Sequence, residues 1–436
     1  MKRRMLASAA CAALTFVCAP ASGATSPEIT MSSPAAFSAN QAVDSFYASR
    51  HGAPLWLRAG ADSSAARELI GVLERAPLDG LDSGPAIAAE AKTLMSRAQM
   101  GDSAALASAD RLLSTGWVLY AEAVQRPPSG VIYADQWVRP RQQSPLQILT
   151  QAAQAPSLAA YVRKVSEVNP LYAQLRDTAW SQMQSNGGQV DPRVLTSLDR
   201  VREHPFQKRY VIVDTAAARL YMIEDGQIAG SMKVIVGKAA PGTQTPMLAS
   251  TIYYATLNPY WHVSPELVRT LIAQNVLDKG LGYLKTQGYQ VMPADPNDDT
   301  LLDPAKVDWH AVADGQLQVR VRELPGPANS MGRIKFGFPN KWDIYLHDTP
   351  VKALFAQDDR DLSHGCIRLQ DAERLGAWML GRDPRADSRD PELNVPLPTP
   401  VPIYVTYLTA QVNGGQLSYV DDIYGLDQAA EVAALR

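Results

Sequence analysis

The first half of the chain has the hydrophobic spacing of amphipathic helices. From Leu106 to Tyr120, apolar side chains recur every three or four residues, as expected for the buried face of a helix. Ser144-Pro145 combines a good N-cap residue with a proline at the first helical position, which predicts another helix start. Strand-like alternation is hard to find in residues 46–203. We therefore expect an α-helical scaffold domain over these residues.

The second half changes to short apolar or alternating runs that are typical of strands. Runs at 220–223 and 228–236 flank Asp225-Gly226, a dipeptide that favours a tight hairpin turn. The pattern therefore predicts an α+β fold, in which an α-helical N-terminal lobe precedes a mostly β domain at residues 204–410. Further strand candidates are 210–213, 252–255, 317–321, 334–336, 342–346 and 403–408.

Three segments depart from the strand pattern. Residues 264–325 begin with Ser264-Pro265, a helix-start signal, and continue into a long polar stretch, so we expect an insertion into the β domain with the character of a lid. The prolines between residues 384 and 402 predict a stiff, extended linker. Residues 411–436 are expected to form a C-terminal strand and tail.

The N-terminus has the pattern of an export signal. A basic start at residues 2–4 precedes an apolar run at 6–17 and small residues at 19–21, which predicts a signal peptide over residues 1–24. The apolar run is shorter than the roughly 20 residues that a membrane span needs. We expect an exported, periplasmic chain whose mature form has no membrane span. The Ser, Ala and Pro-rich residues 25–45 are expected to be a flexible lead-in.

Composition narrows the class of protein. The 436 residues are 46% hydrophobic, which indicates a folded chain, and a length of this size is typical of two or three domains. Lys and Arg total 41 against 44 Asp and Glu, so no chain-wide basic field favours nucleic acid. Of three cysteines, Cys11 and Cys18 lie in the expected signal peptide. The remaining thiol, Cys366, is either a buried apolar group or a reactive one.

Two histidines are candidates to activate Cys366. A free cysteine has a pKa of about 8.5, so a neighbouring histidine is the usual means of making a thiolate near neutral pH. His364 is close in sequence, whereas His347 ends a separate predicted strand, and spacing alone does not choose between them. Zinc binding by His347, His364 and Cys366 is one alternative, because all three are residue types that bind zinc. The other alternative is that Cys366 is a core thiol and the two histidines are ordinary loop residues.

The loop before Cys366 has features of an oxyanion site. Gly365 permits a sharp turn, and the N–H groups of His364, Gly365 and Cys366 are candidates to stabilise the oxyanion that forms when a thiolate attacks a carbonyl. Tyr345 shares a strand face with His347. Both side chains are therefore expected to face one cleft.

Other site patterns are incomplete. Residues 295–299 begin like a calcium loop, but Thr300 replaces the required glycine and Lys306 stands where the bidentate glutamate should be. We expect no metal and no cofactor.

His347 together with Ser363-His364-Gly365-Cys366-Ile367-Arg368 resembles the signature of the L,D-transpeptidase catalytic domain (YkuD domain). Asn258-Pro259-Tyr260-Trp261, Leu324-Pro325-Gly326-Pro327 and Phe338-Pro339-Asn340 resemble the large periplasmic branch of that family. That branch combines an α-helical scaffold domain with a catalytic domain that carries an inserted capping subdomain. The resemblance covers roughly residues 195–425 and assigns 264–325 to the capping subdomain.

This resemblance implies peptidoglycan cross-linking. Cys366 would attack the amide after the third residue of a tetrapeptide stem and release D-alanine, while His347 would accept and return the proton. The family orients this histidine through a backbone carbonyl, here that of Asp348. The side-chain amine of diaminopimelate on an acceptor stem would then resolve the thioester into a 3-3 cross-link. Carbapenem β-lactams would be covalent inhibitors.

The resemblance also leaves choices open. Tyr345, Arg368 and Ser363 are candidates for the substrate pocket, although Arg368 can equally hold the loop together. Residues 181–203 are too short for the small peptidoglycan-binding module that the branch often carries, and His262 stands where asparagine is expected. The alternatives are an L,D-carboxypeptidase or another cysteine peptidoglycan hydrolase, and a non-catalytic cell-wall scaffold protein.

Overall fold

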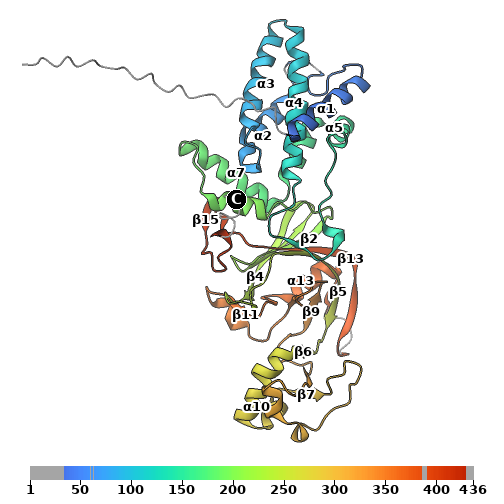
Figure 1. Ribbon diagram of the computed structural model, residues 1–436, viewed down its shortest axis with the longest axis vertical. Helices are drawn as coiled ribbons and strands as arrows, with labels where there is room; N and C mark the ends of the chain where they lie inside the picture. The colour runs from blue at the N-terminus through green and yellow to red at the C-terminus, as the bar shows by residue number, and fades with distance from the viewer. Residues whose placement is uncertain (1–33, 59, 62, 385–389, 429–436) are drawn as a thin grey trace, which may run out of the picture.

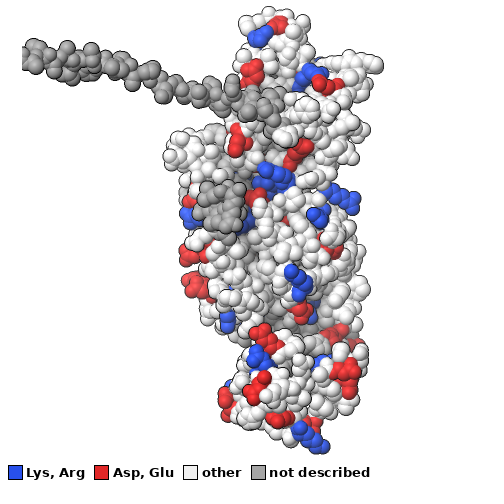
Figure 2. Space-filling view, viewed as in Figure 1, with Lys and Arg blue, Asp and Glu red and all other residues white. Residues whose placement is uncertain are grey.

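The computed structural model describes residues 34–428 apart from 59, 62 and 385–389. Figure 1 shows a helical lobe at one end, a β domain in the middle and a small mixed lobe at the other end. Acidic and basic side chains are interspersed over all three parts on the face in Figure 2. The expected signal peptide, residues 1–24, lies outside the described residues. No described helix combines the length and the apolarity that a membrane crossing requires.

The N-terminal lobe is helical, as predicted. Ser144 is the N-cap of α5 and forms a capping box. Its side chain accepts from the main-chain N–H of Gln147, and the Gln147 side chain accepts from the main-chain N–H of Ser144. Trp56 and Trp117 are buried in its core, with ring centroids 6.0 Å apart. The helices are α1 (Pro34–Ser49), α2 (Ser64–Arg75), α3 (Gly84–Gln99), α4 (Ser103–Val124), α5 (Pro145–Gln154), α6 (Leu158–Glu167), α7 (Pro170–Ser185) and α8 (Pro192–Arg200), with 3-10 turns at Ala76–Asp79 and Gln136–Val138.

Helix α1 corrects the expectation of a flexible lead-in up to residue 45. It begins at Pro34 and buries Ala36, Ala39, Val43 and Phe46. These positions recur every three or four residues. Two of the four are alanines in a segment rich in serine and alanine, so the sequence pattern alone showed little contrast between the two faces. Contact with α4 and α5 is what makes this weakly apolar face a buried one.

The β domain is a sheet that closes on itself. Its strands follow the order β1-β5-β13-β2-β3-β4-β12-β10-β9, and β9 also pairs with β5, which completes a barrel. The predicted hairpin is present, with Asp225 and Gly226 at φ 48° and 77° between β3 and β4. The strands are β1 (Ile132–Tyr133), β2 (Arg209–Asp214), β3 (Arg219–Glu224), β4 (Gln227–Gly237), β5 (Leu248–Leu257), β9 (Ile334–Gly337), β10 (Tyr345–His347), β11 (Asp361–Ser363), β12 (Ile367–Leu369) and β13 (Leu393–Thr406).

Strand β2 is buried on both faces, which joins the two lobes. Val211 and Val213 belong to the barrel core, and that core also contains residues of α13 (Ala372–Leu380). Tyr210 and Ile212 face the other way and belong to a second core with residues of α7 and α8. The alternation along one strand therefore fixes the scaffold helices against the barrel.

The C-terminal segment is a hairpin rather than one strand. β14 (Ala410–Asn413) pairs with β15 (Gln416–Tyr419), and both strands contact α7. Gly414 and Gly415 have φ values of 57° and 79° in the connecting turn. Two glycines permit this conformation without strain. The segment expected to be a single strand and a tail therefore contains a turn between two strands.

The proline-rich segment is another correction, because much of it lies in the long strand β13. Pro396 and Pro402 are in register with β5, and the register shifts between Pro396 and Val401. Pairing with β2 is confined to Ile403–Thr406. Proline cannot donate a ladder hydrogen bond, so it fits where one edge of a strand is open or where the ladder is irregular. Pro396, Pro398, Pro400 and Pro402 therefore lie in a strand and not in a linker, whereas Pro384 and Pro391 precede it.

Residues between β5 and β9 form the small lobe at the foot of Figure 1, which we call the cap. Its sheet has the order β6-β8-β7, and Val263, Ile272, Trp309 and Val321 belong to a core of its own. The first cap strand begins at Trp261, ahead of the expected boundary at residue 264. The cap elements are β6 (Trp261–Val263), α9 (Pro265–Leu267), a π-helical turn (Val268–Ala273), α10 (Gln274–Lys279), α11 (Gly282–Thr286), β7 (Tyr289–Met292), α12 (Trp309–Ala313) and β8 (Arg320–Glu323).

Candidate active site

Pairing of two strands brings the sequence-predicted site residues together. β10 and β12 are parallel neighbours, with Leu346 opposite Ile367 and His347 opposite Arg368. A cavity of about 420 Å³ opens beside them. It is lined by Tyr345, His347, Ser363, His364, Cys366 and Arg368 from the barrel, and by cap residues that include Trp261 and Glu266.

The loop before Cys366 is held by its own hydrogen bonds. Ser363 Oγ donates to the Cys366 carbonyl at 2.6 Å and accepts the Gly365 N–H at 3.1 Å. Thr245 Oγ1 donates to the Gly365 carbonyl at 2.7 Å. Gly365 has a φ of 115°, a conformation that strains any residue with a Cβ. The segment is therefore a preorganised turn.

Two expectations change because of this network. The Gly365 N–H is already bonded to Ser363 Oγ, so the fold favours its loop-shaping role over a contribution to an oxyanion site. The Ser363 hydroxyl is engaged at both ends and only 2% of the residue is exposed, so the expected substrate contact is replaced by a loop contact. The main-chain N–H groups of His364 and Cys366 remain the oxyanion candidates.

His347 is buried and held in one tautomer. Its Nδ1 lies 2.6 Å from the carbonyl of Asp348, and because a carbonyl can only accept, Nδ1 carries the proton. Nε2 is then the unprotonated nitrogen that can take a proton. Burial, together with the charge of nearby Arg368, lowers the pKa of His347 to about 3. The ring is therefore neutral at physiological pH and ready to act as a base.

Asp348 orients His347 through its main chain and not through its carboxylate. One carboxylate oxygen accepts the Arg333 N–H at 2.9 Å, and the other accepts from Lys352 Nζ at 2.6 Å. This agrees with the implied orientation by a backbone carbonyl. The carboxylate fixes the loop and leaves the carbonyl aimed at the histidine.

We expect Gly332→Ala to lower the acylation rate without removing a reacting group. A Cβ at Gly332 would lie 2.3 Å from Asp348 Oδ2, and the glycine φ is 60°, so Asp348 and its carbonyl must move. Displacement of a general base by a fraction of an ångström should lower the rate by about tenfold or more. Stopped-flow acylation with a β-lactam measures this change. Gly282→Ala, where the added Cβ meets nothing within 4 Å, is the control and should leave the rate unchanged.

The thiol of Cys366 is protonated in the resting site. Burial raises the pKa of Cys366, while hydrogen bonds from the main chain and side chain of Tyr345 oppose that shift. Sγ donates to the carbonyl of Asp343 at 3.7 Å. The resting pair is thus a thiol beside a neutral imidazole, so ionisation must accompany attack on the substrate.

His364 is placed differently from His347. It is exposed on the cavity rim, and burial with the charges of Lys238 and Arg368 lowers its pKa. No hydrogen bond fixes its tautomer in the part of the chain that the structure describes. Of the two histidines that spacing left equivalent, His347 is the one whose tautomer and orientation are fixed by the fold.

Two family models match the two large parts of the chain. The model of the L,D-transpeptidase catalytic domain (YkuD) matches residues 208–403, and a scaffold-domain model matches residues 41–178. Together they account for well over half of the sequence. The chain belongs to the L,D-transpeptidase family.

Known proteins are similar to parts of this L,D-transpeptidase. A Haemophilus influenzae protein with the provisional name L,D-transpeptidase is 26% identical over 400 residues, which cover 89% of this chain and 78% of that protein. The L,D-transpeptidase structure from Mycobacterium smegmatis is 15% identical over 46% of this chain and 58% of that one, with a TM-score of 0.24. L,D-transpeptidase 3 from Mycobacterium tuberculosis, solved with a faropenem-derived adduct, is 16% identical over 46% and 60%, with a TM-score of 0.23. This chain thus spans less than two thirds of each of these two solved chains.

His262 links the cap of this L,D-transpeptidase to the barrel domain. Its Nε2 lies 2.8 Å from the Glu392 carboxylate, and Glu392 immediately precedes β13. Tyr260 lies beside the histidine ring, with centroids 6.0 Å apart. His262, in β6, therefore contacts a carboxylate across the domain boundary, and it also lines the cavity that contains Cys366.

Several residues of the cavity wall received no site role from the sequence, among them Trp342, Asp343 and Glu266. Trp342 and Asp343 precede β10, and Glu266 lies in α9 of the cap. Asn340, in the same loop as Trp342, was part of the resemblance but received no role. The sequence signal for Trp342 and Asp343 was their position just before the Tyr345–His347 strand. That position alone could not predict that the loop brings the Asp343 carbonyl to the Cys366 sulfur.

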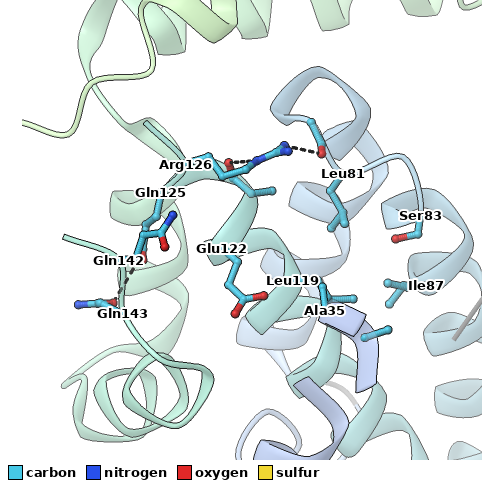
Figure 3. Close-up of a pocket in the computed structure, with 13 residues that line it drawn as sticks. Ala35, Leu81, Ser83, Ile87, Leu119, Glu122, Gln125, Arg126, Gln142 and Gln143 are labelled. Carbon is cyan, nitrogen blue, oxygen red and sulfur yellow. Dashed lines mark hydrogen bonds between the residues drawn. The ribbon is translucent and has the colours of Figure 1, made fainter. Parts of the chain in front are cut away.

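A second cavity, of about 400 Å³, lies in the helical lobe (Figure 3). Leu81, Ile87 and Leu119 provide apolar walls, and Glu122 is the acidic side chain labelled there. Burial raises the pKa of Glu122. The lining contains no cysteine or histidine, so the candidate catalytic groups are in the barrel cavity. Among the described residues, no group of three or more His, Cys, Asp or Glu side chains is arranged to hold a metal ion.

Proposed function

We propose that this L,D-transpeptidase forms 3-3 cross-links between peptidoglycan stems in the periplasm through a thioester on Cys366. The observation that carries the proposal is that a neutral, single-tautomer His347 and the Cys366 thiol line one cavity between barrel and cap. Family membership supplies the reaction class. A thiol with a neighbouring base and oxyanion donors is the arrangement that acyl transfer requires.

In the acylation step, the Cys366 thiol proton passes to His347 Nε2 as sulfur attacks the carbonyl carbon of the third stem residue. The main-chain N–H groups near Cys366 stabilise the oxyanion of the tetrahedral intermediate. When the C–N bond breaks, His347 returns the proton to the leaving nitrogen of D-alanine. The buried Nδ1 contact with Asp348 keeps the ring in the orientation that both transfers need.

In the second step, the side-chain amine of a diaminopimelate on the acceptor stem attacks the thioester. His347 accepts the amine proton and returns it to the sulfur, which regenerates the thiol. Arg368, partly buried opposite His347, is proposed to bind a stem carboxylate, because a guanidinium can form paired hydrogen bonds with one. Tyr345, which lies in β10 with His347, is proposed to contact the acyl group.

Product analysis with purified disaccharide-tetrapeptide stems tests the proposal. Mass spectrometry should show cross-linked dimers and free D-alanine. Tripeptide without dimer would instead assign the L,D-carboxypeptidase alternative, in which water resolves the same thioester. Unchanged tetrapeptide from folded protein would favour the non-catalytic scaffold alternative.

We expect a carbapenem to acylate Cys366. The strained lactam presents a carbonyl to the sulfur, and ring opening leaves the amine attached, so one intact drug mass is added. The measurement is intact-protein mass followed by peptide mapping, with one equivalent on the Cys366 peptide. An adduct on another residue would contradict the assignment of Cys366 as the nucleophile, and no adduct on protein that still makes dimers would mean that the cleft differs from the family pattern.

A further inference from the structure

The loop that precedes β10 is locked by one side chain. Asn340 Nδ2 donates to the carbonyls of Phe338 and Ile344 at 2.9 and 2.7 Å. Asn340 Oδ1 accepts the N–H groups of Trp342 and Ile344 at 3.1 and 3.0 Å. One amide therefore satisfies four main-chain groups over residues 338–344. A loop held in this way keeps a defined shape in the absence of substrate.

That shape puts Asp343 in an uncommon backbone conformation beside the sulfur. Its φ is 52°, a left-handed value that aspartate and asparagine tolerate better than most residues. The main-chain carbonyl of Asp343 accepts from Cys366 Sγ at 3.7 Å. Left-handed residues outside glycine often mark functional sites, and this one forms part of the cavity wall.

We propose that Asp343 is a positioning residue for the nucleophile: its main-chain carbonyl, held by the Asn340 lock, and its carboxylate, carried on the same loop, together keep Cys366 as a thiol in the resting enzyme. This inference rests on the proposed role of Cys366. The carbonyl accepts the S–H and thereby fixes the sulfur direction before substrate enters. Proton transfer to His347 then requires the S–H to leave Asp343.

The charges around the sulfur support this role. The Asp343 carboxylate acts to raise the pKa of Cys366, whereas Lys335 lowers it and Tyr345 donates hydrogen bonds to it. The same carboxylate also acts to raise the pKa of Tyr345. The other titratable or charged groups facing the cavity are Arg368, His347, His364, Glu266 and His262. Asp343 is thus an acidic group whose charge acts directly on the sulfur.

Keeping the thiol protonated has a chemical advantage. Thiolates are oxidised to sulfenic acid far more readily than thiols, and an exported enzyme works in an oxidising compartment. Cys366 is a free cysteine that is only partly buried, so oxidants can reach it. A resting thiol that ionises only when substrate enters would be protected between turnovers.

The pH dependence of alkylation at Cys366 tests the proposal. Iodoacetamide reacts with the thiolate, and peptide mapping isolates the Cys366 signal from other cysteines. Asp343→Asn keeps the main-chain carbonyl and tolerates the left-handed φ, but removes the charge. We expect its alkylation midpoint to move to lower pH and its rate at pH 7 to rise several-fold. Asp358→Asn, which removes an exposed carboxylate outside the cavity, should match the wild type.

A second variant tests the lock. Asn340→Ala should shift the midpoint in the same direction, because the released loop takes both the carbonyl and the carboxylate away from the sulfur. The double variant Asn340→Ala, Asp343→Asn should shift little further than either single one. Circular dichroism and thermal melting establish that each variant is folded.

An unchanged midpoint in folded Asp343→Asn would overturn the proposal, as would fully additive shifts in the double variant. Alkylation does not require stem peptides. Failure of this inference is therefore distinguishable from failure of the proposed transpeptidation, which the dimer assay measures separately.

Discussion

Cys366→Ser is expected to lower acylation by stem peptides and by carbapenems by about a thousandfold or more. A serine hydroxyl is far less acidic than a thiol, so the same neutral His347 removes its proton far less readily. Sulfur also attacks and leaves carbonyl carbon more readily than oxygen. The measurement is the rate of D-alanine release from tetrapeptide stems, followed by intact mass with a carbapenem.

The fold should survive this change, because the loop is held by Ser363, Gly365 and Thr245 and not by the sulfur. The melting temperature of Cys366→Ser should therefore match that of the wild type, which is the control for the activity loss. Undiminished D-alanine release by the folded variant would remove Cys366 from the mechanism and leave the cavity without its nucleophile.

His347→Ala is expected to lower the acylation rate by about 10²- to 10⁴-fold at neutral pH, the usual range for loss of a general base. Raising the pH should recover part of the rate, because the Cys366 thiol then ionises without help. In the wild type, the rate should rise with pH toward the raised pKa of Cys366. Protonation of His347 should matter only as the pH falls toward about 3.

His364→Ala is the matched comparison, because both histidines line the same cavity. His364 is exposed and no residue fixes its ring in the described structure, so its loss should cost about tenfold or less. Acylation rates of the two variants, measured with one carbapenem over a pH series, give the order directly. A larger defect in His364→Ala would reverse the assignment of the base.

Much of the architecture was determined by local sequence signals. The Asp225-Gly226 hairpin turn and the Ser144 helix start predict structure through φ preferences and capping hydrogen bonds that involve only neighbouring residues. The signature around Cys366 and His347 indicated the family in the same way, because its spacing is short and specific. The Asp348 carbonyl, implied by that resemblance, is in contact with His347.

Other features depended on residues far apart in sequence. The alanine-rich face of α1 is buried because α4 and α5 cover it, and the prolines near the start of β13 fit a strand because β2 pairs only with its end. Neither partner is visible from the local pattern. Burial and edge exposure are properties of the assembled fold. For this reason the weak hydrophobic contrast of α1 predicted a flexible lead-in, and the high proline content before and within β13 predicted a linker.

The catalytic details show the same division. Sequence named Cys366, His347 and His364, and only the family resemblance, not the spacing, favoured His347 as the base; in the structure, burial and the Asp348 contact distinguish the two histidines. The Gly365 N–H looked free until the Ser363 hydroxyl was placed beside it. Residue types with reactive groups are determined by the sequence. Which lone pairs and protons remain available is decided by tertiary structure, because each hydrogen bond made within the fold removes a donor or an acceptor from the chemistry.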